Sequence, residues 1–421
     1  MRFPKLFGKG APVAETKESQ AASTLVLNPG QPVWSKRDFS EFAREGYQKN
    51  VVAAMCVQKT AEAMSSVLLE VWRGETLLTE HPLIDLMNRP NPQMSGREYI
   101  EAWASFLLIA GNTYEERFDI RGEPRELYML RPDRMRPIAS KDGLVSGFEY
   151  TGPNGQKRRW DVDVIRGEFP IWHTKLFNPL DDWIGQSPME AGAYSIDQHN
   201  EAMAWMQGLL QNSARPSGAL VYGGDNSLSD DEFNRLKVQM QEQYSGSRNA
   251  GRPMLLEGGL TWVQMGLNPS DMGITEAKHS AARDVALAFG VPAMLLGIPG
   301  DNTYANYAEA RLSFWEDTVI PLLGRFIDEH NAWLAEPMGV ELKANLDDIP
   351  AIVDKRKSLW DMADKSTDLT INERRELKGY PPIPEGDVLA QDQALTRDPE
   401  TAETNIKALS RIAGYEKTAK R

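Results

Sequence analysis

The chain has 421 residues and a formal net charge of −13, from 60 acidic side chains against 47 lysines and arginines. This length predicts about two to four domains, and 41% apolar with 25% charged residues is typical of a soluble globular protein. The acidity argues against a protein that grips nucleic acid, because such proteins usually carry a basic surface. A single cysteine excludes a disulfide framework, and we expect Cys56, in the apolar run VVAAMCV, to be buried.

The sequence predicts no membrane partner. Its longest uncharged apolar stretch, residues 285–300, is broken by Gly and Pro and is shorter than the ~20 residues that span a bilayer. The first ten residues are basic but lack the apolar run, roughly 7–15 residues long, of a secretory signal. We therefore expect a protein made and used in a cytoplasm, or in something assembled there.

The first half of the chain predicts helices followed by strands. Residues 1–30 predict a flexible arm, and apolar spacing predicts a helix over 51–69. Ser95 and Glu98 form a predicted capping box for a further helix, which ends at Gly111-Asn112. A strand-rich stretch comes next and predicts one meandering sheet, hence an α+β fold, with strands at 113–120, 127–130, 136–139, 147–151 and 157–160.

The second half predicts long helices around a small insert. Ser187-Pro188 opens a helix to about 213 with few charges, which we expect to be enclosed by its own domain or by neighbouring subunits. Residues 214–266 predict a β–α–β insert with a hairpin around Gly258-Gly259. The remaining predicted elements are a helix over 271–289, an apolar loop over 292–303, a helix over 304–335 kinked at Pro321, a strand over 341–345 and helices beyond 350.

Motifs of enzymes are missing from the sequence. It contains no P-loop, no GxGxxG after a strand, no HExxH and no GxSxG, and its five histidines are far apart. Adjacent carboxylates occur at Asp181-Asp182, Asp230-Asp231 and Asp347-Asp348, where capping or solvation explains them better than general acid/base chemistry. We therefore predict neither an enzyme nor a cofactor or metal site.

The apolar loop is the most unusual feature of the sequence. It is rich in Gly and Pro, yet it carries Met294, Leu295, Leu296 and Ile298 between two helix breakers. One interpretation is a loop tucked into its own core. The other is a loop that packs against copies of itself or projects into a confined channel.

Several segments resemble the HK97-type tailed-bacteriophage portal proteins, in the order found in that family and over about residues 50–340. The residues that carry the resemblance are HPLIDLMNRPNPQMSGREYIEAWASFLLIAGNTYEE (81–116), LRPDRMRPI (130–138), WHTKLFNPLDDWIGQSPMEAGAYSI (172–196), NSARPSGALVY (212–222), ALAFGVPAMLLG (286–297) and NYAEARLSFWEDTVIPLL (306–323).

The resemblance implies a portal-type protomer in a ring of twelve, at one vertex of a viral head, through which DNA is packaged and ejected. It implies long stem helices, a β-rich wing, a β–α–β clip and a helical crown. Its parts would be an N-terminal arm (1–30), the wing (31–186), a stem helix (187–213), the clip (214–269), a second stem helix (270–289), a tunnel loop (290–303), a long kinked helix with a return to the wing (304–349) and the crown with the C-terminal tail (350–421).

The same resemblance implies partners and site residues. Double-stranded DNA would pass non-specifically along tunnel-loop residues Pro292, Met294, Leu295, Leu296, Ile298 and Asn302. The clip would face the terminase large subunit and then head–tail adaptors, through Asp225, Asn226, Asp230, Asp231 and Arg248. The major capsid protein would be a further partner, in a virion that is assembled in the host bacterial cytoplasm.

Two other functions stay open at this point. A hydrolase that uses scattered carboxylates would be a monomer or dimer with a cleft of perturbed pKa values. A head–tail adaptor or scaffold-like module is the other alternative, although 421 residues is long for an adaptor.

Overall fold

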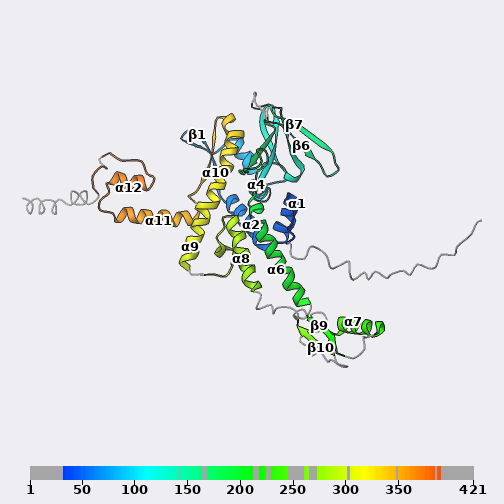
Figure 1. The fold of residues 1–421 in the computed structure, drawn as a ribbon. Helices are drawn as coiled ribbons and strands as arrows, with labels where there is room; N and C mark the ends of the chain where they lie inside the picture. The colour runs from blue at the N-terminus through cyan, green and yellow to red at the C-terminus, as the bar shows by residue number, and fades with distance from the viewer. Residues whose placement is uncertain are drawn as a thin grey trace, which may run out of the picture.

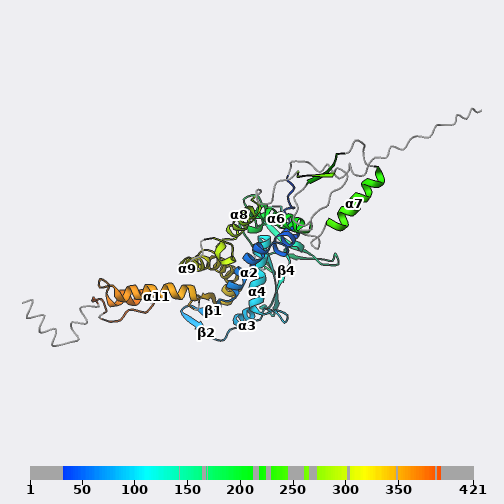
Figure 2. The ribbon, with the colours of Figure 1, turned by 90° about the horizontal axis from the view of Figure 1, so that it is seen from below.

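The computed structural model describes residues 32–389, apart from 142, 164–166, 168, 212–217, 224–228, 245–259, 265–272, 301–303, 348 and 385. Figure 1 shows a central body around α2, α4 and α10, from which the paired helices α6 and α8 run towards β9, β10 and α7. Helices α11 and α12 extend from another side of the body, and Figure 2 shows α11 and α7 at opposite ends of the molecule.

The elements follow the chain in the order expected of a mixed α and β protein. The helices are α1 (Phe39–Glu41), α2 (Val51–Ser65), α3 (Pro82–Asn88), α4 (Gly96–Ala110), α5 (Pro188–Ala191), α6 (Ala193–Gln211), α7 (Asp230–Tyr244), α8 (Ile274–Ala288), α9 (Tyr304–Ser313), α10 (Ile320–His330), α11 (Pro350–Lys365) and α12 (Ile371–Leu377). The strands are β1 (Leu68–Arg73), β2 (Thr76–Leu78), β3 (Asn112–Ile120), β4 (Glu123–Leu130), β5 (Met135–Ala139), β6 (Val145–Thr151), β7 (Lys157–Asp161), β8 (Ile171–Lys175), β9 (Gly218–Tyr222), β10 (Leu260–Gln264) and β11 (Glu341–Asn345).

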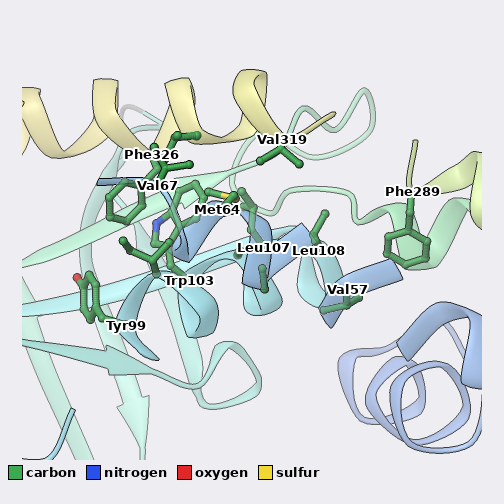
Figure 3. Close-up of a cluster of buried hydrophobic side chains, with 14 of the residues drawn as sticks. Val57, Met64, Val67, Tyr99, Trp103, Leu107, Leu108, Phe289, Val319 and Phe326 are labelled. Carbon is green, nitrogen blue, oxygen red and sulfur yellow. The ribbon is translucent and has the colours of Figure 1, made fainter. Parts of the chain in front are cut away.

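Helices α2 and α4 form the centre of the core because their apolar residues recur on one face. The Asn50 side chain caps α2 by accepting from the backbone N–H groups of Val52 and Ala53. The predicted Ser95–Glu98 capping box at the start of α4 is present. Figure 3 shows side chains of both helices meeting Phe289, Val319 and Phe326 in one cluster.

The strand-rich stretch forms two sheets instead of the single meander that the sequence predicts. One antiparallel sheet has the order β4-β3-β8 and the other has the order β5-β6-β7. A small second core joins them, and within it Tyr114 meets Phe148 edge to face at 5.8 Å between ring centroids. Strand β8 closes the first sheet by pairing with β3, a long-range partnership that local alternation does not reveal.

One further prediction needs correction. We expected the helix over 304–335 to be interrupted by a kink at Pro321. The interruption is instead a stretch of π-helix at Phe314–Val319, and Pro321 lies in the first turn of α10, which follows it. Strand β10 pairs with β9, antiparallel from Leu260↔Tyr222 to Gln264↔Gly218. The other strand of the predicted hairpin, 254–256, lies outside the described residues.

Strand β3 places a carboxylate at the centre of the body. Successive side chains of a strand point to opposite faces, so Tyr114 faces the second sheet and Glu115 faces the helices. Glu115 is fully buried and accepts hydrogen bonds from the Tyr99 hydroxyl and, at 3.1 Å, from the Trp103 indole. Its Oε2 also lies 3.0 Å from Nε2 of His330, so one side chain joins β3, α4 and α10.

Removing this carboxylate should destabilise the whole body. In Glu115→Ala, the Tyr99 hydroxyl, the Trp103 indole and the His330 ring lose their buried partner, which we expect to lower the free energy of unfolding by ~3–5 kcal/mol. The exposed Glu123→Ala should change it by less than about 0.5 kcal/mol. Urea unfolding followed by tryptophan fluorescence measures both, and equal stabilities of the two variants would contradict the central role of Glu115.

Candidate functional site

Helices α6 and α8 lie side by side and connect the body to β9, α7 and β10 (Figure 1). Small residues allow the close approach: α8 buries Ala281, Ala282 and Ala286, and a Cβ at Gly192 would lie 3.2 Å from the Cβ of Ala288. The predicted stem helix 187–213 is thus interrupted at Gly192, between α5 and α6. Ser187 caps α5 by accepting from the N–H of Glu190.

Buried polar side chains fix α6 to the start of the described chain. Asp197 accepts hydrogen bonds from the backbone N–H of Ser35 at 3.0 Å and from its hydroxyl at 2.7 Å. The Asn50 amide lies 3.2 Å from Nδ1 of His199 and donates to Oδ1 of Asn200 at 3.0 Å. Burial, with a smaller contribution from nearby Lys278, lowers the pKa of His199. These polar contacts orient the helix about its own axis.

The rest of α6 presents apolar side chains to solvent within the single chain. Tyr194, Met203, Trp205 and Leu210 are all exposed, and Leu287 of α8 is 78% exposed. Helices with such faces are covered by another surface when the protein is in its working form. The helix pair is therefore a candidate association surface.

The apolar loop after α8 begins as a compact turn against the body. Residues Ala293–Leu296 form a turn of 3₁₀ helix, and Leu295 and Leu296 are half-buried against the main core. The Thr318 hydroxyl donates to the carbonyl oxygen of Gly290 at 2.6 Å, and Arg283 donates to that of Pro299. The base of the loop is thereby attached to α8 and to the π-helical stretch.

The residues predicted to line a channel differ in their exposure within the single chain. Ile298 is only 8% exposed and belongs to the main core, so its side chain is not free to contact a duplex. Pro292 and Met294 are half-buried, and Asn302 lies outside the described residues. Among the described residues of this segment, the exposed ones are Gly297, Pro299 and Gly300.

The predicted β–α–β insert is present as β9, α7 and β10. Ser229 and Glu232 cap α7 reciprocally: the Ser229 N–H donates to Oε2 of Glu232 at 3.0 Å, and the Glu232 N–H donates to Oγ of Ser229 at 3.4 Å. Of the predicted docking residues, Asp230 begins α7 and Asp231 is exposed in its first turn. The other three, Asp225, Asn226 and Arg248, lie outside the described residues. Phe233 and Val238 of α7 are also exposed.

The carboxylates have structural partners in this fold. Asp181 accepts from the backbone N–H groups of Trp183 and Ile184, and Asp347 pairs with Arg356 at 2.6 Å. Burial raises the pKa values of Glu116 and Glu329, but Glu116 accepts from Arg158 and Glu329 from the Trp172 indole.

Within the described ranges, no three His, Cys, Asp or Glu side chains are placed to hold a metal ion. Nor is any helix among those ranges long and apolar enough to cross a membrane.

An asparagine joins the first sheet to the segment that leads into α5 and α6. Asn112 Oδ1 accepts from the N–H of Gly185 at 2.8 Å, and its amide donates to the carbonyl oxygen of Gly185 at 3.2 Å. His173 Nε2 donates to the same Oδ1 at 3.0 Å, while its ring stacks on Tyr114 with 4.2 Å between centroids. The backbone approaches so closely that a Cβ at Gly111 would lie 2.6 Å from the carbonyl oxygen of Gly185.

Sequence reasoning missed two buried polar clusters of the body. One surrounds Glu115 and the other surrounds Asn112, and we call them the Glu115 centre and the Asn112 centre. The Glu115 centre had a weak signal, the alternation of polar and apolar residues in β3, which becomes informative only once both faces of the sheet are known to be covered. The Asn112 centre had a signal in the Gly111-Asn112 pair, which we interpreted only as the end of a helix. His81 caps α3, since its Nδ1 accepts from the N–H of Leu83 at 3.2 Å.

A helical body that carries an apolar, unpartnered helix pair defines a subunit of a larger assembly. The family model for the phage portal protein matches residues 51–379. An uncharacterized protein of Rickettsia bellii (strain RML369-C) is 39% identical over 351 residues, 82% of this chain and 90% of its own. The portal protein of Enterobacteria phage HK97 is 24% identical over 321 residues, which are 73% of this chain and 72% of that protein.

A solved structure points in the same direction. A chain from the neck of a native gene transfer agent (GTA) particle, computed with C12 symmetry, superposes with a TM-score of 0.63 and 42% identity. The superposition covers 84% of this chain and 96% of that one. The chain belongs to the phage portal protein family, which is structural rather than enzymatic. The expected family, the mixed α and β fold and the portal-type protomer are thus confirmed.

The buried histidine of the Asn112 centre predicts a pH dependence of stability. Burial, with a smaller contribution from Lys175, lowers the pKa of His173 to about 3, against about 6.5 when unfolded. Between these two values the unfolded chain binds the extra proton, so the stability contributed by neutral His173 is lost as the pH falls from about 6.5 towards 3. In His173→Gln this part of the pH dependence should disappear. Urea unfolding of both proteins between pH 7 and pH 4 measures it, and parallel curves would refute the assignment.

Proposed function

We propose that twelve copies of this chain form a closed ring at one vertex of a capsid, which serves as the channel for DNA packaging and ejection. The observation that carries the proposal is the 42% identity and 84% coverage of this chain by the subunit from a C12 particle neck. The exposed apolar side chains of α6 and α8 support it, because a ring gives each subunit two neighbours to cover them. The similarity favours a tailed particle of the GTA or phage kind, in which the protein is a virion component assembled in the bacterial cytoplasm.

In this ring the loop 290–303 narrows the channel. We assign contact with DNA to its exposed part, Gly297, Pro299 and Gly300, instead of to the buried Ile298. We call these three residues the tip of the loop. Leu295 and Leu296, which precede the tip, are half-buried and pack against the main core. The three exposed residues carry no charge, so they touch the duplex without holding its phosphates.

The ends of the protomer are the docking sites. The β9–α7–β10 unit projects from the body on α6 and α8 (Figure 1), which suits a clip that meets the terminase large subunit and later a head–tail adaptor. Its helix α7 offers the exposed apolar side chains of Phe233 and Val238 and, in its first turn, the acidic Asp231. The β-rich part of the body is the wing that faces the major capsid protein, and α11 and α12 begin the crown.

Purified protein should form closed rings. Twelve chains of 47.2 kDa have a mass of about 566 kDa, which light scattering measures, and electron microscopy should show a central hole. A Trp205→Glu substitution on the exposed face of α6 should shift the population to smaller species, because it places a charge in the subunit interface. A wild-type chain that stays monomeric at high concentration would refute the ring.

A charge on the tip of the loop should impair transport of DNA. In Pro299→Lys each ring gains twelve positive charges at its narrowest point, so the phosphates are held and packaging falls severalfold. Pro299→Gln is the matched control, since it also removes the proline side chain but adds no charge. Nuclease-protected DNA per particle measures the effect, and equal packaging by the two variants would place the constriction elsewhere.

A further inference from the structure

The loop between β8 and α5 exposes two large apolar side chains. Phe177 is 83% exposed and Leu180 is 94% exposed, and Trp183 and Ile184 lie partly exposed in the same loop. We call residues 177–184 the knob loop. The acidic pair Asp181-Asp182 adjoins Leu180. The Lys175 ammonium donates to the backbone carbonyl oxygen of Asp182, and the Asp182 carboxylate has no ion pair among the described residues. A surface of this kind is suited to a partner that is apolar in its centre and basic at its edge.

Side chains hold the knob loop in one shape. Asn178 accepts from the N–H of Leu180 at 2.9 Å and donates to the carbonyl oxygen of Ile184 at 2.9 Å. Asp181 accepts from the N–H groups of Trp183 at 2.7 Å and Ile184 at 2.9 Å. The Trp183 indole donates to the carbonyl oxygen of Gly143 at 3.1 Å. A loop ordered in this way loses little conformational entropy when it docks.

A groove of matching chemistry lies elsewhere on the same body. It has a volume of about 250 Å³, far above the ~10–15 Å³ that one water molecule needs. We call it the α2–α4 groove, and the residues that matter here are Ser66, Leu68, Ile84, Met87, Arg97 and Ile100. Leu68 is 57% exposed, and the exposed Arg97 guanidinium has no carboxylate partner among the described residues.

The knob loop and the groove lie at opposite ends of α4. The groove includes Arg97 and Ile100 in the first turns of that helix, beside α3 (Figure 2). The knob loop is attached at the other end, where Asn112 binds Gly185. Fifteen helical residues separate the two by about 22 Å, so the loop of a chain does not reach the groove of the same chain.

We propose that the knob loop of one subunit docks in the α2–α4 groove of the next subunit, with Phe177 and Leu180 over the apolar floor and Asp182 facing Arg97. The inference rests on the proposed ring and names one contact that closes it. A ring of identical chains needs two different, complementary surfaces on each subunit, and these two match in polarity and charge. A second copy of the chain is therefore the occupant that the surfaces fit.

Thiol cross-linking tests the contact in the intact ring. In the double variant Ser66→Cys/Leu180→Cys, both positions are exposed, and a short bis-maleimide should join neighbouring subunits into a ladder of multimers on a denaturing gel. The native Cys56 does not interfere, because it is fully buried and burial raises the pKa of its thiol to about 12. The control variant Thr151→Cys/Leu180→Cys, with an exposed position outside the groove, should give no ladder.

The outcomes separate this contact from the ring itself. Rings of about 566 kDa with no ladder from the Ser66→Cys/Leu180→Cys variant would overturn the contact and leave the ring standing. A ladder of equal strength from the control would also overturn it. A chain that remains monomeric would overturn both proposals.

Exchanging the two charges gives a second measure. Arg97→Asp and Asp182→Arg should each raise the protein concentration at which half of the rings dissociate by about two- to fivefold, and the double variant should restore the wild-type value. Mass photometry over a dilution series reads this concentration. Effects of the two single substitutions that simply multiply in the double variant would contradict the pairing.

Discussion

The position of every outer part of this protein depends on the buried carboxylate of Glu115. A charge without solvent is costly unless donors surround it, and here the Tyr99 hydroxyl and the Trp103 indole supply them, with Nε2 of His330 lying 3.0 Å from the same carboxylate. Burial and the neighbouring carboxylate raise the pKa of Tyr99 well above its ordinary value, so this hydroxyl remains a donor. His330 in turn donates through Nδ1 to the carbonyl oxygen of Phe326 at 2.7 Å. These directional contacts allow one relative placement of β3, α4 and α10, where apolar packing alone would allow several.

The outer parts extend from these three elements. Helix α10 continues from the π-helical stretch whose Thr318 holds Gly290, so its placement sets the base of the apolar loop. Helix α4 carries the groove at one end and, through Asn112, the knob loop at the other. The same asparagine sets the start of the path into α5 and α6. Buried polar groups therefore determine where the proposed association surfaces lie.

Local elements with their own chemical signals could be predicted from the sequence. The Ser95–Glu98 and Ser229–Glu232 caps, strand β9 and strand β11 are present where capping chemistry and alternation indicate them. What failed were partnerships between distant segments, such as β8 with β3, which depend on the whole fold. Ile298 shows the same limit, because an apolar residue in a Gly- and Pro-rich loop has equal reason to face a core or a channel. Only the path of the chain around Thr318 and Arg283 decides that it faces the core.

The charge of the chain has a different meaning once the ring is considered. The first 50 residues carry a net +3, so the acidity belongs to the rest of the sequence. In the proposed ring, twelve copies bring a total charge of about −156 around one hole, and a field of that sign disfavours tight binding of phosphates. Screening at physiological salt limits that field to about 8 Å from each exposed charge, so it acts where a duplex nearly touches the wall. An uncharged tip at Gly297, Pro299 and Gly300, carried on an acidic body, is therefore suited to guiding DNA that has to keep moving. The acidity excludes a clamp on DNA, but it is compatible with a conduit.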